Sequence, residues 1–189
     1  MTLIIDYGLD SPARALLILA LSMNDRTKKK EMDIVHIHKT IKYFEHLEQK
    51  EMIDFSNFKL GGVSYELHEN LETLQECDLV DKVGNKYVLT KKGEKAAKEL
   101  LGTHSEEEIR KLKFAKLQIN DLTQKETLFF MYMLIPETQK YSTEFAELYK
   151  QRNVLVPKLF LKGRINSTTA AKWSGVDEKT FLDSLQTSD

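Results

Sequence analysis

Two groups of basic side chains carry the chemistry needed to contact phosphate. The first lies in a polar stretch over residues 24–33 and consists of Arg26, Lys28, Lys29 and Lys30. The second surrounds a Gly-Asn pair and consists of Lys82, Lys86, Lys91 and Lys92, with Lys95 beside them. Cations that neutralise phosphates release condensed counterions, which is the main source of non-specific affinity for DNA. Both groups are therefore candidate DNA-phosphate contacts, and the alternative is ordinary solvated surface.

Four carboxylates occupy a segment that carries no lysine or arginine. The segment SYELHENLETLQEC covers residues 64–77, and its Leu67, Leu71 and Leu74 repeat at helical spacing. The exposed side of such a helix presents Glu66, Glu69, Glu72 and Glu76. Carboxylates repel phosphates, so we do not expect this helix to read DNA. It is instead a candidate surface for a protein partner.

The sequence does not assemble an enzyme active site. It contains no glycine-rich phosphate loop and no nucleophile elbow. His36 and His38 stand two apart and would lie on different sides of a helix. His68 and Glu72 are four apart but have no third ligand nearby in the sequence. Cys77 is the single cysteine, which excludes an intrachain disulfide and a cysteine-based zinc site. We therefore expect no catalytic residue, cofactor or metal.

Composition indicates a soluble globular protein. The chain has 189 residues, and its 28 basic residues nearly cancel its 29 acidic ones. A formal net charge of -1 argues against non-specific coating of nucleic acid but permits a local basic patch. The start, MTLIIDYGLD, does not resemble a signal peptide, and the longest apolar stretches are far shorter than the ~20 residues that span a bilayer. We expect a cytoplasmic protein without a membrane partner.

The basic and acidic residues must be positioned by short helices and one hairpin. Ser11-Pro12 is typical of a helix start, and Asp33 and Ser64 are candidate N-caps. Two alternating runs around Gly84-Asn85 predict a β-hairpin. The predicted elements are helices beginning at Ser11-Pro12, Asp33 and Ser64, hairpin strands over 79–83 and 86–90, and a helix over 94–101. The stretch 55–60 is either a short strand or irregular, and Gly61-Gly62 is expected to break the chain.

This order of helix, helix, helix, hairpin and helix resembles the winged-helix fold. The segment LVDKVGNKYVLTKKGEKAAKEL resembles the wing of archaeal and bacterial winged-helix proteins, which commonly carry aromatic-x-Leu-Thr-x-x-Gly, here Tyr87, Leu89, Thr90 and Gly93. The stretch LGGVSYEL over residues 60–67 also resembles the Panacea and YwgA-like domains, although leucine and glycine replace that group's tyrosine and proline. The resemblance implies a transcription regulator, in which the third helix normally enters the major groove.

The C-terminal half is predicted to be all helical. Capping boxes at Ser105 and Thr123 open two helices, and Pro136 ends the second, whose apolar residues face every direction. Burying such a helix favours a homodimer with residues 124–135 near the interface. Two further helices are predicted over 142–151 and 157–162, the second beginning at Pro157. A third basic cluster near the tail consists of Lys158, Lys162, Arg164 and Lys172.

The tail over residues 165–185 resembles a helix-turn-helix. Ala171 and Gly175 stand four apart, and Phe181 follows after six more residues. The segment is also similar to the C-terminal part of small prokaryotic antitoxin-like proteins. The alternative is a plain helical hairpin that packs Trp173 and Phe181 into the core.

The sequence therefore predicts a mostly α (α+β) protein: a winged helix-turn-helix domain with a β-hairpin wing over 11–102, followed by an all-helical region over 103–189. The predicted function is a non-enzymatic regulator that contacts duplex DNA through the wing and the basic loop. The alternative is a protein-interaction adaptor or antitoxin-like module that does not bind DNA.

Overall fold

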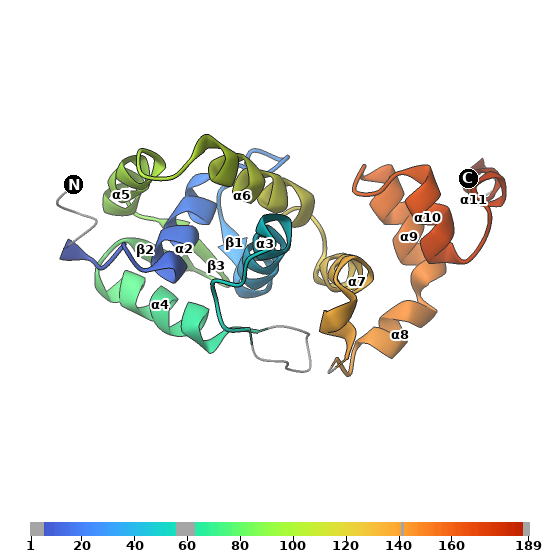
Figure 1. Cartoon of the computed structure of the whole chain (residues 1–189), viewed down its shortest axis with the longest axis horizontal. Coiled ribbons are helices and arrows are strands. Elements are labelled where there is room, and N and C mark those ends of the chain that lie inside the picture. The colour runs from blue at the N-terminus through green and yellow to red at the C-terminus, as the bar shows by residue number, and fades with distance from the viewer. Residues whose placement is uncertain (1–5, 56–62, 141, 187–189) are drawn as a thin grey trace. The chain divides into compact units, whose positions relative to one another are not determined.

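The computed structural model describes residues 6–55, 63–140 and 142–186 and is drawn in Figure 1. The protein is mostly helical and has a small antiparallel sheet of three strands. Its described residues form two compact units, and the boundary follows Leu122. The sequence analysis placed the domain boundary after residue 102, whereas the helix over residues 106–119 belongs to the first unit.

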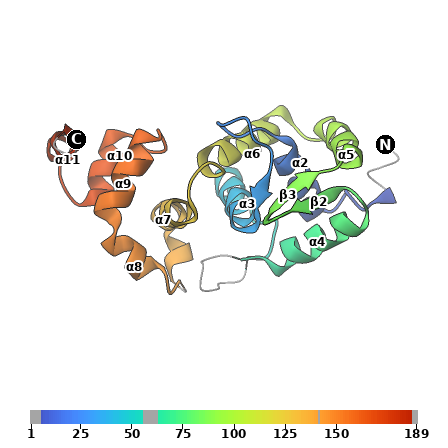
Figure 2. The same ribbon diagram turned by 180° about the vertical axis from the view of Figure 1, so that it is seen from behind.

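The first unit is built around an apolar central helix. Helix α2 (Pro12–Ser22) lies between α4 (Tyr65–Glu76) and α5 (Lys91–Leu101), as Figures 1 and 2 show. Helix α3 (Ile34–Glu48) packs against α6 (Glu106–Ile119). Leu17, Ile18 and Leu21 of α2 are fully buried. Because α2 is apolar on every side, it is stable only where other elements shield all its sides from water. The predicted helix beginning at Ser11-Pro12 is confirmed.

The sheet joins a hairpin to a short third strand. Its strands are β1 (Met32–Asp33), β2 (Val80–Val83) and β3 (Lys86–Leu89), in the order β1-β3-β2. The predicted hairpin is confirmed, with Val83 opposite Lys86 and with Gly84 in the left-handed conformation at the turn (φ 64°). Strand β1 was not predicted, since two residues are too few to show alternation. It pairs Met32 with Tyr87 and Asp33 with Lys86.

Four helices begin at predicted residues whose side chains cap them. Asp33 accepts a hydrogen bond from the backbone N–H of His36, and Ser64 accepts one from that of Leu67. The capping boxes at Ser105 and Thr123 are both formed. Ser11 is the N-cap residue of α2 but makes no side-chain cap hydrogen bond.

Helix α5 begins earlier than predicted. The sequence analysis started it at Glu94, but Thr90 caps it by accepting from the backbone N–H of Gly93, so the helix begins at Lys91. A Cβ on Gly93 would stand 2.0 Å from the carbonyl oxygen of Leu79, so only glycine fits here. This close approach accounts physically for the Leu-Thr-x-x-Gly pattern.

The described residues of the second unit, 123–140 and 142–186, form helices and their connections, with no strand. They are α7 (Gln124–Leu134), the 3-10 turn η1 (Pro136–Gln139), α8 (Phe145–Lys150), α9 (Arg152–Leu161), α10 (Ser167–Ser174) and α11 (Glu178–Gln186). The predicted helix over 142–151 is shorter than expected. The predicted start at Pro157 is wrong, because Pro157 lies inside α9. The buried Leu155 and Leu159, four apart, show the helical periodicity that continues across the proline.

The apolar helix α7 is buried in the chain. Phe129 and Phe130 both pack edge-on against Trp173 at centroid distances of 6.2 Å, and the Tyr132 hydroxyl accepts a hydrogen bond from Ser142 Oγ at 2.6 Å. Phe181 is also buried, against Phe160. The burial of α7 therefore does not by itself require a second subunit, and the homodimer stays a prediction that light scattering can test.

An ion pair between the buried Glu126 and the partly exposed Lys162 stabilises the start of α7, and removing its charge should destabilise the protein. Glu126 Oε2 lies 2.7 Å from Lys162 Nζ and accepts from the Thr123 N–H at 2.8 Å. Burial raises the Glu126 pKa, but hydrogen bonds from Lys162 and Thr123 outweigh it and the net pKa is lowered. The pair's contribution is therefore present above the ordinary pKa of 4.5 and lost as pH falls below it.

We expect Glu126→Gln to lower the free energy of unfolding by about 1–3 kcal/mol at neutral pH and by less in acid. Urea unfolding followed by circular dichroism measures both values. The exposed Glu147, paired with Lys150, provides the control variant Glu147→Gln. An equal loss in the two variants would contradict a special role for the pair of Glu126 and Lys162.

Candidate functional site

The pairing of β1 with β3 brings the first predicted basic group beside the second, at Lys86 of the hairpin. The basic loop runs directly into β1, and β1 lies beside Lys86 of the hairpin. Lys86 Nζ lies 3.5 Å from Glu31 Oε1, and Lys30 Nζ lies 3.2 Å from Glu94 Oε1. We call this region, residues 26–31 with 82–92, the basic edge. Its formation depends on a contact between residues more than fifty positions apart.

The loop of the basic edge is held in shape by one buried carboxylate. Asp25 is 5% exposed and accepts from the backbone N–H groups of Thr27 (2.8 Å) and Lys29 (2.9 Å). It also accepts from Asn120 Nδ2 at 2.8 Å. Burial raises the Asp25 pKa, but these hydrogen bonds outweigh it and the net pKa is lowered. The loop therefore turns tightly, with Lys28 in the left-handed conformation (φ 64°) and its basic side chains exposed.

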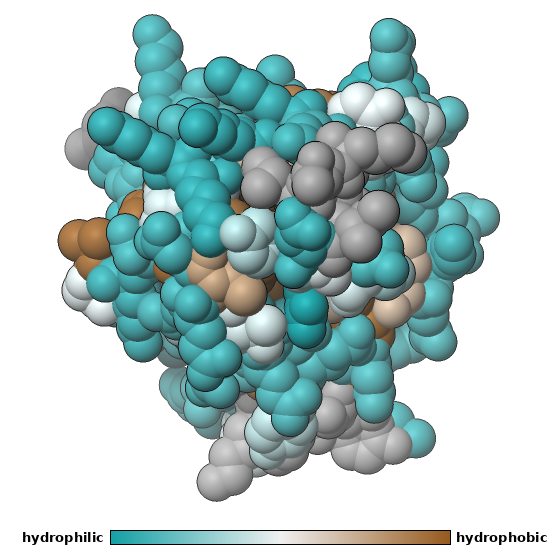
Figure 3. Space-filling model, turned by 90° about the vertical axis from the view of Figure 1, so that its left-hand side faces the viewer, coloured by the Kyte–Doolittle hydropathy of each residue, from teal (hydrophilic) through white to brown (hydrophobic). Residues whose placement is uncertain are grey.

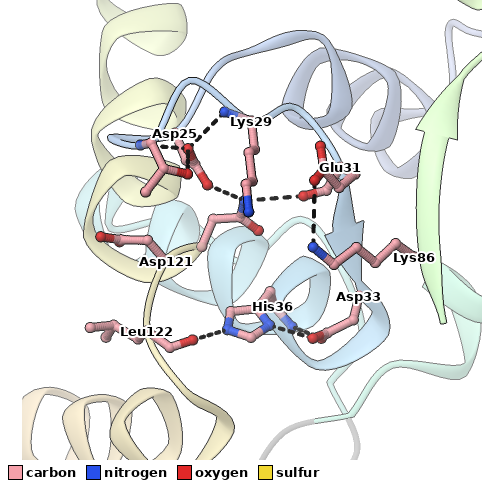
Figure 4. A pocket seen from close by; sticks show the side chains of 10 residues that line it. Asp25, Lys29, Glu31, Asp33, His36, Lys86, Asp121 and Leu122 are labelled. Carbon is pink, nitrogen blue, oxygen red and sulfur yellow. Dashed lines mark hydrogen bonds and ion pairs between the residues drawn. The ribbon is translucent and has the colours of Figure 1, made fainter.

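A polar pocket of about 300 Å³ lies beside this loop, as Figure 4 shows. Its lining mixes acidic, basic and neutral groups: Asp25, Thr27, Lys29, Glu31, Asp33, His36, Lys86, Asn120, Asp121 and Leu122. The two predicted phosphate contacts in it, Lys29 and Lys86, thus share the pocket with four carboxylates. The lining of the pocket is therefore of mixed charge rather than purely basic.

His36 lines this pocket and lies between two hydrogen-bond acceptors. Its Nδ1 lies 2.8 Å from Asp33 Oδ2 and its Nε2 lies 2.9 Å from the carbonyl oxygen of Leu122 (Figure 4). Burial raises the Asp33 pKa, but hydrogen bonds from His36 and the charge of its ring outweigh it and the net pKa is lowered. The sequence analysis gave His36 no catalytic or metal-binding role, and the Asp-x-x-His spacing at a helix start was the signal for this contact.

Some of the remaining predicted phosphate contacts bind other groups of the protein, and others are exposed to solvent. Arg26 Nε donates to the Leu117 carbonyl at 3.1 Å, and Lys92 Nζ donates to the Cys77 carbonyl at 2.7 Å. Lys82 Nζ lies 5.4 Å from the centre of the Tyr87 ring. Lys28, Lys82 and Lys91 are exposed. Some of the predicted lysines therefore help to hold the fold, whereas these three present their charge to solvent.

The acidic residues of α4 lie largely on its solvent side, as predicted. Glu69, Glu72 and Glu76 are exposed. Glu66 is half-buried, and its Oε2 accepts from the Asp54 backbone N–H at 3.3 Å. Figure 3, drawn from the side where α4 and α5 lie in Figure 1, shows mostly hydrophilic residues among those it colours, with only isolated apolar ones. A partner of this face would be recognised by charge rather than by apolar contact.

The predicted basic cluster of the tail is divided by the fold. Lys162 pairs with Glu126, and Arg164 is 8% exposed and donates to the Lys162 carbonyl at 2.8 Å. Only Lys158 and Lys172 of this cluster are exposed. The turn predicted between Ala171 and Phe181 is present, with Gly175 in the left-handed conformation between α10 and α11 (φ 77°). Glu178, at the start of α11, accepts from the hydroxyls of Ser167 and Thr168.

Sequence reasoning also missed a pair of histidines. The rings of His38 and His68 lie 4.9 Å apart, and His38 Nδ1 accepts from the Ser64 backbone N–H at 3.0 Å. Burial, with smaller effects of the nearby His68 and Lys39, lowers the His38 pKa to about 3. Across residues 6–55, 63–140 and 142–186, no group of three or more histidine, cysteine or acidic side chains is arranged to hold a metal ion.

Within that same part of the chain, no helix is both long and apolar enough to cross a membrane. Comparison with known proteins does not identify a relative: no family model matches the sequence, and neither a curated protein nor a solved structure is significantly similar to it. Residues 60–62, on which the Panacea-like resemblance partly depends, lie outside the described residues.

Proposed function

We propose that this protein is a non-enzymatic winged-helix regulator that contacts DNA phosphates through its basic edge. The element order α2, β1, α3, α4, β2, β3 and the sheet order β1-β3-β2 support the winged-helix resemblance. The observation that carries the proposal is the β1–β3 pairing, because it unites two basic groups that are separate in the sequence. A joint surface can neutralise several neighbouring phosphates at once.

Because α4 is acidic, the proposed contact with DNA would differ from that of most winged-helix proteins, which insert the third helix into the major groove. A recognition helix lies in the major groove, where phosphates flank it on both sides. Glu69, Glu72 and Glu76 would oppose that position. The proposed contact therefore uses the hairpin and the loop against the backbone, with little direct reading of bases.

Binding to a random-sequence duplex, measured by fluorescence anisotropy at several salt concentrations, tests the proposal. Contact with about three or four phosphates predicts a slope of about -3 to -4 for the logarithm of the association constant against that of salt concentration. We expect measurable affinity at about 50 mM salt and its loss by about 200 mM. No binding even in dilute salt would refute the proposal.

The exposed carboxylates of α4 favour a second candidate function, that of a protein-interaction adaptor. They form a row on one helix that contains no lysine or arginine. A partner with a basic surface would be attracted to such a row, and the attraction would weaken with salt. In that case the basic edge is dispensable and Glu69→Gln with Glu72→Gln weakens the complex.

A further inference from the structure

His36 connects two parts of the first unit through its two ring nitrogens. On one side it meets Asp33, which is also the N-cap of α3. On the other it meets the carbonyl of Leu122, the last residue of the first unit. The next residue, Thr123, is the N-cap of α7 and begins the second unit. The imidazole therefore anchors the backbone at the boundary between the units.

Both partners of this imidazole can only accept hydrogen bonds. A backbone carbonyl has no proton to donate, and an ionised carboxylate has none either. The 2.8 Å and 2.9 Å contacts therefore need an N–H on each ring nitrogen, and only the imidazolium has two. Neutral imidazole has one N–H, so it can keep only one of the contacts. The other nitrogen would then turn a lone pair toward an oxygen.

We propose that His36 is a proton-dependent clamp that holds the unit boundary at Leu122 when the imidazole is doubly protonated and releases it when one proton leaves. The bond to Asp33 is charge-assisted and therefore the stronger of the two. On deprotonation the remaining N–H stays with Asp33, and the Leu122 carbonyl loses its donor. Release of the boundary therefore accompanies the loss of one ring proton as pH rises.

Some of the charged groups around His36 favour the doubly protonated ring, and others oppose it. From the loop, the carboxylates of Asp25 and Glu31 favour the imidazolium, whereas Lys29 opposes it. Lys86 of β3 opposes it as well, but it is paired with Glu31. Asp33, at the start of α3, and Asp121, beside Leu122, add two more carboxylates. The pocket thus holds four carboxylates against two lysines, which supports the doubly protonated ring.

Nuclear magnetic resonance of the full chain tests the clamp at two levels. The ring nitrogens of His36 report whether one or both carry a proton, and amide protection factors for residues 120–123 report whether the boundary is held. As pH is raised through the range in which His36 titrates, we expect the ring to change from doubly to singly protonated. Protection at the boundary should fall about three- to tenfold over the same range, as expected for the loss of one hydrogen bond.

Two variants separate the clamp from a general effect of pH. Asp33→Asn keeps a capping side chain but removes the carboxylate charge, so the ring should lose its second proton, and the boundary its protection, at lower pH. His46→Gln, at an exposed position of the same helix, should leave the profile unchanged. A singly protonated ring at every pH, or boundary protection that does not follow the ring, would overturn the proposal.

Discussion

Reversing three exposed lysines of the basic edge is expected to abolish DNA binding. Lys28, Lys82 and Lys91 present their charge to solvent. Lys86 and Lys92 are less suitable, because Glu31 and the Cys77 carbonyl hold them and their reversal would also disturb the fold. Each lost phosphate contact lowers the salt slope by about one unit, so the triple reversal to glutamate should bring the slope close to zero.

A matched control changes the net charge by the same amount elsewhere. Lys113 on α6, Lys125 on α7 and Lys150 on α8 are also exposed, and their reversal to glutamate removes the same number of cations. We expect this control to weaken duplex binding slightly, through the long-range field alone. Anisotropy titrations of the wild type and both triple variants give the comparison. Equal losses in the two variants would show that net charge rather than the basic edge determines binding.

The same variants distinguish the regulator from the adaptor. If the regulator is correct, Glu69→Gln with Glu72→Gln leaves duplex binding unchanged or tightens it, because two charges that repel phosphate are removed. If the adaptor hypothesis is correct, the lysine reversals leave the binding of the protein partner unchanged. The two glutamine changes then reduce the affinity for a basic partner.

Replacing the buried Lys116 by methionine is expected to cause a large loss of stability. Lys116 is fully buried in α6, and its Nζ donates to the carbonyls of Ala20 (2.8 Å) and Lys30 (2.6 Å). It thereby links the end of α2 to the loop of the basic edge. Methionine has a similar volume but no donor, so we expect the free energy of unfolding to fall by about 2–4 kcal/mol at neutral pH.

The loss of stability caused by Lys116→Met should grow as pH rises. This direction of the pH dependence would show that the buried amine of Lys116 is the cause. Burial lowers the Lys116 pKa from 10.5 to about 7, against the attraction of Asp25 and Glu31. Above pH 7 the unfolded chain therefore binds more protons at this position than the folded chain, so the wild-type residue adds stability as pH increases. The difference between wild type and variant should widen by roughly 2–3 kcal/mol between about pH 7 and pH 9.

Urea unfolding at the two pH values measures this difference. Lys39, whose pKa burial also lowers to about 7, contributes a similar rise to both proteins, so the comparison cancels its effect. Lys113→Met, at an exposed position of the same helix, is the control and should change neither stability nor its pH dependence by much. A constant difference between wild type and Lys116→Met would mean that the buried amine does not titrate in this range.

Local structure could be predicted from the sequence, because it depends on neighbouring residues. Asp33, Ser64, Ser105 and Thr123 each cap a helix through a backbone N–H three positions on. The hairpin turn follows from Gly84, whose backbone is left-handed. The predictions that were wrong concern helix starts, at Thr90-capped α5 and at α9. In both cases a residue that usually marks a boundary, glycine or proline, lies inside the helix.

Which charged groups lie next to one another depends on contacts between distant segments, and only the folded structure shows it. Two residues of β1 bring the basic loop to Lys86, and no alternation in so short a strand could reveal the pairing. The sequence shows the acidic side of α4 but not that Glu66 is drawn toward Asp54. Likewise, the partner of His36 at Leu122 is 86 residues away. Contacts over such distances are set by the packing of whole helices. The spacing of residues along one segment contains no information about that packing.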